Sequence, residues 1–204
     1  MDILNIGLTL FIVFALLLSI FFIWRTLQQR RRVNVAKITM RDIERMAGLE
    51  FEDYLAAVFA AIGYETYRTT KSGDFGADLL VIDKEGKRIV IQAKRYDTKL
   101  GLSCVQEVYT AKAYYDADET MVVTSANEVT AACWQLAAKT GTSFLLKEDL
   151  EELSYLLRKG QLGEARELVC TPQYAEKKPG SPRLEAVSGE RRRIEVGAYH
   201  YTRK

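Results

Sequence analysis

The strand-like segment of residues 88–94 (RIVIQAK) carries two polar side chains, Gln92 and Lys94, after the apolar run of residues 89–91. Successive side chains of a strand point to opposite faces, so Gln92 and Lys94 fall on the same face. The preceding apolar run, residues 77–83, adds the carboxylate of Asp78 directly after a glycine-rich loop. Burying such groups is costly unless they are paired or bind a cation, and strands that look central do not need them for packing. These residues therefore indicate a polar site.

Whether Asp78 meets Gln92 depends on the turn between the two strands. If residues 84–86 form a three-residue loop with Gly86 in the left-handed conformation, the register places Asp78 opposite Gln92 on the same face. A two-residue turn would place Asp78 opposite Ala93 instead. Only the first register brings the polar groups together.

The segment before these strands, residues 39–62, has the apolar periodicity of a helix and supplies a second acid. Its apolar stripe recurs at three- and four-residue steps and comprises Phe51, Tyr54, Leu55, Val58, Phe59 and Ile62. At 100° per residue, Glu52 falls at the edge of this stripe, whereas Glu50 and Asp53 face water. We therefore expect Glu52 to look into the sheet; the alternative is a surface acid that extends to water.

Periodicity and turn residues predict the elements that position these groups. We expect a strand at 64–70, a hairpin of strands 77–83 and 88–94, helices at 103–115, 129–139 and 148–159, and strands at 121–125 and 143–146. Alternation of strands and helices implies right-handed crossovers and a partly parallel sheet. The predicted fold class is α/β: a helix, a three-strand meander, and then alternating helices and strands.

Five short motifs occur in a fixed order: FE at 51–52, GY at 63–64, GDFGAD at 73–78, QAKRY at 92–96 and VVTS at 122–125. Over about residues 47–153 the chain resembles the Mrr-type restriction endonuclease catalytic domain, of the PD-(D/E)xK nuclease superfamily. The resemblance implies a restriction-endonuclease-like α-β-β-β-α-β core with a mixed central sheet flanked by helices. It also implies an enzyme, an endodeoxyribonuclease.

Matched position by position, the resemblance implies that Asp78, Gln92 and Glu52 bind the metal and that Lys94 completes the catalytic set. The family has a glutamine where the superfamily usually has a carboxylate, and Glu52 would supply the missing anionic ligand. The implied metal is Mg²⁺, which Mn²⁺ can replace; it prefers oxygen ligands, polarises a phosphoryl oxygen and lowers the pKa of bound water. Lys94 would orient the attacking hydroxide and offset negative charge. The implied substrate is DNA, in a restriction-like activity directed at modified or foreign DNA.

Each of these residues also has a structural interpretation. Lys94 suits an edge strand, where a charge discourages aggregation. Gln92 alone is equally compatible with a structural role, and Asp78 could cap the turn that precedes it. Asp74 is the better candidate for that turn, so we leave it out of the ligand set.

Charge is divided unevenly along the chain. The chain carries 29 bases and 27 acids, but residues 38–170 hold 16 bases against 22 acids. An acidic globule that grips a polyanion needs a local basic rim. The bases near the motifs are Arg68, Lys71, Arg95 and Lys99. They form either such a rim or an ordinary solvated face. The strand-ending hydroxyls of Thr124 and Ser125 either cap the next helix or contact a phosphate.

Rare residues argue against several other kinds of site. His200 is the single histidine, so serine–histidine triads, histidine-rich metal sites and HNH nucleases are not indicated. The three cysteines are isolated and form no CxxC, which indicates neither a zinc knuckle nor a disulfide framework. No GxxxxGK[ST] or GxGxxG motif supports nucleotide-driven chemistry.

The N-terminal segment predicts a membrane anchor. Residues 3–24 carry no charge, and a helix of this length spans about 33 Å, enough for a hydrocarbon core of about 30 Å. Five bases follow, so the positive-inside rule places the rest of the chain in the cytoplasm of a single-pass cell-membrane protein. The predicted parts are a transmembrane helix at 1–24, a basic, lipid-contacting juxtamembrane segment at 25–37, an Mrr-like nuclease domain at 38–170 and a basic, disordered tail at 171–204.

One function of another class fits the same sequence: a membrane-tethered nucleic-acid-binding or interaction protein with a degenerate nuclease fold. The complete set of Asp78, Gln92 and Lys94 favours the enzyme, because a domain kept only for binding does not need these groups. Cleavage of both DNA strands ordinarily requires two active sites, so a homodimer is an open alternative to a monomer.

Overall fold

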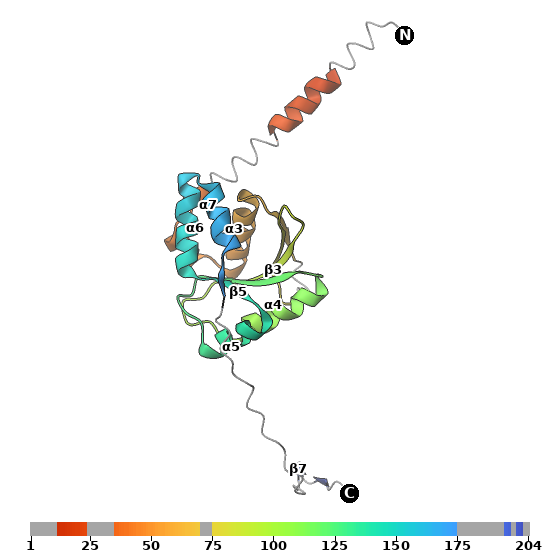
Figure 1. Cartoon of the computed structure of the whole chain (residues 1–204), viewed down its shortest axis with the longest axis vertical. Coiled ribbons are helices and arrows are strands. Elements are labelled where there is room, and N and C mark those ends of the chain that lie inside the picture. The colour runs from red at the N-terminus through yellow and green to blue at the C-terminus, as the bar shows by residue number, and fades with distance from the viewer. Residues whose placement is uncertain (1–11, 24–34, 70–74, 175–193, 197–198, 202–204) are drawn as a thin grey trace, which may run out of the picture.

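The computed structural model describes residues 12–23, 35–69, 75–174, 194–196 and 199–201. The strands of its body are β1 Glu65–Arg68, β2 Leu79–Ile82, β3 Arg88–Lys94, β4 Glu119–Thr124, β5 Ser143–Leu145 and β6 Gln173–Tyr174. They form one sheet in chain order, β1 to β6 (Figure 1). The first three strands make an antiparallel meander, β3, β4 and β5 are parallel, and β6 pairs antiparallel at the edge. This mixed sheet confirms the predicted α/β class.

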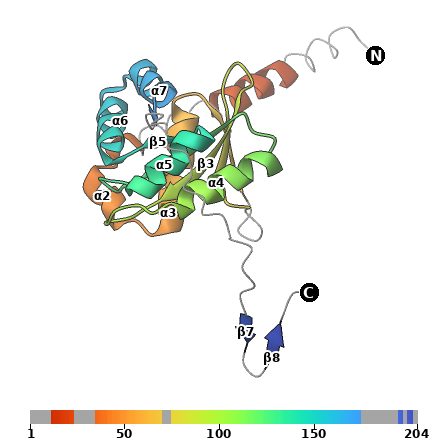
Figure 2. The same ribbon diagram turned by 60° about the horizontal axis from the view of Figure 1, so that its bottom comes forward.

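Helices cover both faces of the sheet (Figures 1 and 2). One face packs against α2 Met40–Arg45, α3 Gly48–Ala61, α6 Lys147–Lys159 and α7 Leu162–Cys170. The other packs against α4 Ser103–Tyr114 and α5 Ala131–Thr140. We call these two sides of the sheet the α3 face and the α4 face.

Side chains of the central strand β3 alternate between the two faces. Ile91 and Ala93 pack in the core shared with α3 and α6, whereas Val90 packs in the core shared with α4 and α5. Gln92 and Lys94 follow Val90 at two-residue steps, so both belong to the α4 face.

The turn between β2 and β3 sets the register of the two strands. Gly86 has a φ of 85°, in the left-handed region, as a three-residue loop requires. The backbone N–H of Asp83 donates to the carbonyl oxygen of Lys87 at 3.0 Å and closes the loop. The pairing of β2 with β3 continues in this register. Of the two registers considered, this is the one that places Asp78 opposite Gln92.

The predicted helix at 39–62 is in fact two helices, so the expectation of a continuous helix is wrong. Met46 and Ala47 adopt extended backbone, with ψ angles of 142° and 159°, between α2 and α3. Glu50 caps the second helix, because its carboxylate accepts a hydrogen bond from the Ala47 N–H at 2.8 Å. The break lets α2 bury Ile43 while α3 buries its own apolar stripe.

The chain after α6 contains more regular structure than predicted. Helix α7 buries Ala165 and Val169 in the core of the α3 face, and β6 extends the sheet beside β5. Two further short strands, β7 Ile194–Val196 and β8 Tyr199–Tyr201, pair with each other. The prediction of a disordered tail at 171–204 is wrong for these strands, and the other residues from 175 onward lie outside the described residues.

The predicted membrane anchor falls partly outside the described residues. Residues 12–23 are helical and exposed. Within the described ranges, no helix is both long enough and apolar enough to cross a membrane. Residues 1–11 and 24–34, which include both ends of the predicted span and most of the basic segment, are not described. Val35, predicted to lie in the juxtamembrane segment, is buried in the core of the α3 face.

Candidate active site

Asp78 stands immediately before β2 and is held against β3 by hydrogen bonds. Its Oδ2 accepts from Gln92 Nε2 at 2.5 Å and from the Ala93 N–H at 2.7 Å. Its own N–H donates to the Ile91 carbonyl oxygen at 2.9 Å. The observed register thus brings the carboxylate of Asp78 into direct contact with the amide of Gln92.

The Gln92 side chain is buried and only partly satisfied. The residue is 4 % exposed, and its nitrogen donates to Asp78. Its Oε1 has no hydrogen-bond partner among the residues that the structure describes. A buried carbonyl oxygen without a donor is costly, and native proteins rarely retain one without a use. Oε1 can therefore accept from, or coordinate, a group that enters the site.

Lys94 contributes a positive charge that an acid of α4 holds in place. Its Nζ lies 2.8 Å from Oε2 of Glu107. Burial favours the neutral amine, but the hydrogen bond and negative charge of Glu107, with a smaller contribution from Asp78, outweigh this effect and raise the pKa of Lys94. In this arrangement Lys94 is an ammonium group and not a base.

Gly76, two residues before Asp78, packs directly on α4 because it has no side chain. A Cβ at Gly76 would lie 2.4 Å from the backbone oxygen of Glu107, and the residue has a φ of 87°. Both the space and the backbone conformation therefore require glycine. One turn of α4 thus contacts both the ammonium of Lys94 and the loop that leads to Asp78.

Glu107 is a member of this cluster that the sequence analysis missed. Several polar residues occupy α4, so its residue type alone does not distinguish it. A positional signal does exist, because Glu107 lies three residues after the buried Cys104 and four before the buried Ala111. That spacing places an acid on the apolar stripe of the helix.

Glu52 does not join the cluster, contrary to the sequence-based expectation. Its Oε2 lies 3.5 Å from a guanidinium nitrogen of Arg68, which also pairs with Asp53. Arg68 is opposite Leu79 in the sheet, and Leu79 belongs to the core of the α3 face. The ion pair of Glu52 therefore lies on the α3 face, whereas Gln92 and Lys94 lie on the α4 face. A helical wheel cannot show that an arginine of a neighbouring strand forms an ion pair with this acid.

The sequence model of the Mrr_cat family, described as restriction endonuclease, matches residues 43–157. This chain belongs to that family. The matched region runs from α2 into α6 and contains the whole cluster of Asp78, Gln92, Lys94 and Glu107.

Two solved structures are similar to part of this Mrr_cat chain. EndoMS in its apo form has a TM-score of 0.40 and 18 % identity, over 48 % of this chain and 45 % of that chain. A repair endonuclease from Pyrococcus abyssi has a TM-score of 0.34 and 22 % identity, over 48 % of this chain and 44 % of that chain. The chain thus spans less than half the length of either protein. No curated protein matches the chain.

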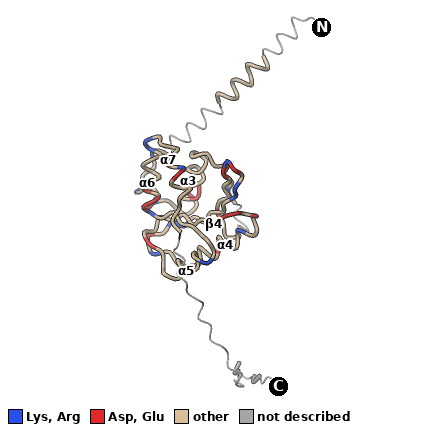
Figure 3. Tube along the Cα trace, in the orientation of Figure 1, with Lys and Arg blue, Asp and Glu red and all other residues tan. Residues whose placement is uncertain are grey.

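The bases expected to form a rim around the Mrr_cat site are paired with acids where the structure describes them. Figure 3 shows basic and acidic residues interspersed over the body. The pairs are Arg68 with Glu52 and Asp53, Arg95 with Asp97 at 3.1 Å, and Lys99 with Glu128 at 2.8 Å. Lys71 lies outside the described residues. A polyanion would have to compete with these acids for the three bases.

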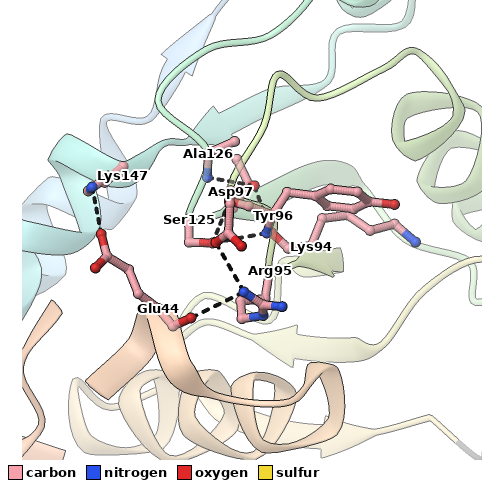
Figure 4. A network of polar contacts seen from close by, with 9 residues as sticks. Glu44, Lys94, Arg95, Tyr96, Asp97, Ser125, Ala126 and Lys147 are labelled. Carbon is pink, nitrogen blue, oxygen red and sulfur yellow. Dashed lines mark hydrogen bonds and ion pairs between the residues drawn. The ribbon is translucent and has the colours of Figure 1, made fainter. Parts of the chain in front are cut away.

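Two hydroxyl groups fix the segment that follows β3 in the Mrr_cat domain (Figure 4). The hydroxyl of Ser125 accepts from the Tyr96 N–H and donates to the Tyr96 carbonyl oxygen, both at 3.0 Å. Thr124 Oγ1 donates to the Lys94 carbonyl oxygen at 2.6 Å. Both hydroxyls therefore hold backbone next to the site, a role that neither sequence-based alternative anticipated.

The oxygen atoms of the Mrr_cat cluster suit a hard divalent cation. Asp78 carries carboxylate oxygens, and Oε1 of Gln92, which has no hydrogen-bond partner in the described part of the chain, is a neutral oxygen beside them. No group of three or more His, Cys, Asp or Glu side chains in the described part of the chain could hold a metal ion. Mg²⁺ is commonly bound by one or two carboxylates together with waters and substrate phosphate oxygens. The residues present fit a cation bound in this way.

Proposed function

We propose that this chain is an endodeoxyribonuclease of the PD-(D/E)xK type that uses Mg²⁺ to hydrolyse phosphodiester bonds in DNA. The observation that carries the proposal is the contact of Asp78 with Gln92, beside the ammonium of Lys94. The amide oxygen of Gln92 is buried and has no hydrogen-bond partner among the described residues. Membership of the Mrr_cat restriction endonuclease family supports DNA as the substrate. The target we propose is modified or foreign DNA, as in a restriction-like activity.

In this proposal each residue of the cluster has a distinct task. Asp78 and Gln92 would hold the Mg²⁺, which when bound polarises a phosphoryl oxygen and lowers the pKa of a coordinated water. The Ala93 N–H keeps Asp78 in place for this role. Lys94 orients the attacking water and offsets the negative charge that develops on the phosphoryl group. Glu107 holds Lys94 as a charged ammonium until the substrate arrives. Glu52 has no part in this scheme.

We also propose that the N-terminal segment attaches the domain to the cell membrane, with the domain in the cytoplasm. Residues 3–24 carry no charge, and the part of this segment that the structure describes is a helix with exposed apolar side chains. The bases of residues 25–37 suit anionic lipid headgroups. The experiments below therefore use the full chain in detergent.

Cleavage of supercoiled plasmid tests the proposed activity. The wild-type chain should cut the plasmid with Mg²⁺ or Mn²⁺ and not with EDTA. Asp78→Asn and Lys94→Ala should each lower the rate by about 10²–10³-fold, because a metal ligand or a charge-stabilising donor is lost. The matched controls Glu151→Gln and Lys139→Ala change exposed side chains and should cut at the wild-type rate.

Cleavage that survives Asp78→Asn or Lys94→Ala would remove the assignment of the site. A chain that binds DNA but does not cut it, whichever divalent cation is added, would favour a nucleic-acid-binding protein with a degenerate nuclease fold. Linear product formed without a nicked intermediate would support a homodimer.

A further inference from the structure

Two aromatic rings lie stacked on the surface beside the candidate active site. Phe75 and Tyr114 have ring centroids 3.7 Å apart and planes inclined by 19°. Phe75 is 49 % exposed and Tyr114 is 57 % exposed. Large apolar rings at a protein surface are costly to hydrate, so an exposed stacked pair next to a reactive cluster is a candidate contact surface. We call Phe75 and Tyr114 the aromatic platform.

The backbone presents Phe75 at the surface in an unfavourable conformation. Phe75 has a φ of 48°, in the left-handed region that residues with a Cβ rarely adopt. Gly76, the next residue, is pressed against the backbone of Glu107. Gly76 thus holds Phe75 next to α4, where its half-exposed ring stacks on Tyr114 of that helix. Residues held in such conformations cluster at functional sites.

The platform and the catalytic cluster lie along the same side of α4. Glu107, which pairs with Lys94, and Tyr114 are seven residues apart, so they point in directions only about 20° apart. Along the helix axis they are separated by about 10 Å. This distance corresponds to about three nucleotides at the 3.4 Å spacing of one strand of B-DNA, and to fewer in an extended single strand.

We propose that the aromatic platform stacks on an unpaired base of the DNA, within about three nucleotides of the phosphate that the cluster cleaves. The inference rests on the proposed function and narrows its substrate to DNA with a single-stranded, mismatched or extruded base. A paired base is already stacked on both faces inside the duplex and offers a protein only its edges. A ring face can therefore be used only by a base that has left the stack, as in single-strand binding and base flipping.

Binding measured without cleavage tests this inference. The full chain in EDTA is titrated with a single-stranded oligonucleotide that contains 2-aminopurine, and with the matching duplex. Phe75→Leu combined with Tyr114→Leu keeps apolar bulk but removes both rings. We expect its Kd for the single strand to rise roughly 5- to 150-fold and the quenching of 2-aminopurine to disappear, while its Kd for the duplex changes less than twofold.

Two further variants separate stacking from folding and from general surface effects. Phe75→Gly removes the ring and also relieves the left-handed strain, so it should lose single-strand affinity while its thermal stability is unchanged or higher. Tyr155→Leu changes an exposed aromatic residue of α6, on the α3 side of the molecule, and should bind both DNAs as the wild type does.

Equal loss of affinity for both DNAs, or no loss for either, would overturn the inference. Because the assay needs no cleavage, the two proposals fail separately. A chain that cuts plasmid but binds single strands equally well without the rings would refute the platform alone. Ring-dependent binding of single strands by a chain that cuts nothing would support the platform and refute the nuclease.

Discussion

The two faces of the sheet differ in the side chains that they bury and in the polar groups that they carry. The α3 face buries the large rings and aliphatic side chains of α3 and α6, and at its edge Glu52 pairs with Arg68. The α4 face buries smaller residues, mostly valine, alanine and cysteine, and keeps Gln92 and Lys94 on β3. Because side chains alternate along a strand, β3 carries polar groups on one face without giving up its apolar residues on the other.

The smaller side chains of the α4 face also have a geometric consequence. They accompany a close approach between α4 and the loop before β2, seen where Gly76 meets the backbone of Glu107. That approach places Glu107 beside Lys94 and Tyr114 beside Phe75. A bulkier layer would separate the helix from the strands that carry the polar groups.

The largest expected effect concerns stability on the α3 face. Phe51 is fully buried, so Phe51→Ala should lower the free energy of unfolding by about 3–5 kcal/mol. Lys94→Ala breaks a partly exposed ion pair and should change the free energy of unfolding by about 1 kcal/mol or less. Urea unfolding followed by circular dichroism measures both. Equal losses in the two variants would show that Lys94 is a structural residue of the α4 face.

An intermediate effect should appear only at alkaline pH. Burial of Tyr54 on the α3 face raises the pKa of its hydroxyl from 10.0 to about 12, although nearby Ser154 and Arg158 oppose this. The folded state therefore holds this proton more tightly than the unfolded state. The resulting stability is present below pH 10 and is lost as the pH rises through about 12. A pKa difference of two units between the folded and unfolded states corresponds to about 2–3 kcal/mol in the free energy of unfolding.

Tyr54→Phe removes this ionisation, so its free energy of unfolding should fall less steeply than that of the wild type between pH 10 and pH 12. Tyr155→Phe, at an exposed position of α6, is the matched control and should follow the wild type. Parallel curves for Tyr54→Phe and the wild type would mean that the hydroxyl is hydrated in the folded protein.

The smallest expected effect concerns activity on the α3 face. Glu52→Gln removes the charge that pairs with Arg68 and leaves the α4 face unchanged, so the rate of plasmid cleavage should stay within about threefold of the wild type. Asp78→Asn, assayed in parallel, provides the comparison. A loss with Glu52→Gln as large as that with Asp78→Asn would place Glu52 in the catalytic set and remove the separation of the two faces.

Local rules predicted the parts of the site that neighbouring strands build. Alternation along residues 88–94 placed Gln92 and Lys94 on one face. The turn allowed two registers, and the one with a left-handed Gly86 brings Asp78 opposite Gln92. Contacts between distant elements were beyond these rules. Nothing in the residue spacing shows that Arg68 of β1 forms an ion pair with Glu52. Nor does it show that Glu107 of α4 pairs with Lys94.

The predicted element boundaries are wrong where a helix cap or a strand-pairing partner overrides the apolar periodicity of the sequence. The apolar pattern continues across residues 46–47, but the hydrogen bond from Ala47 to Glu50 starts a new helix there. The two residues of β6 carry no strand pattern of their own, and their pairing with β5 defines them. Such features depend on the assembled fold and not on the local sequence.

Anomalous scattering from Mn²⁺ soaked into crystals of the full chain would locate the cation itself. We expect one ion on the α4 face with Asp78 and Oε1 of Gln92 among its ligands, and no ion there in Asp78→Asn. An ion bound by Glu52 on the α3 face, or a site near Asp78 that stays empty at Mn²⁺ concentrations that support cleavage, would contradict the assignment.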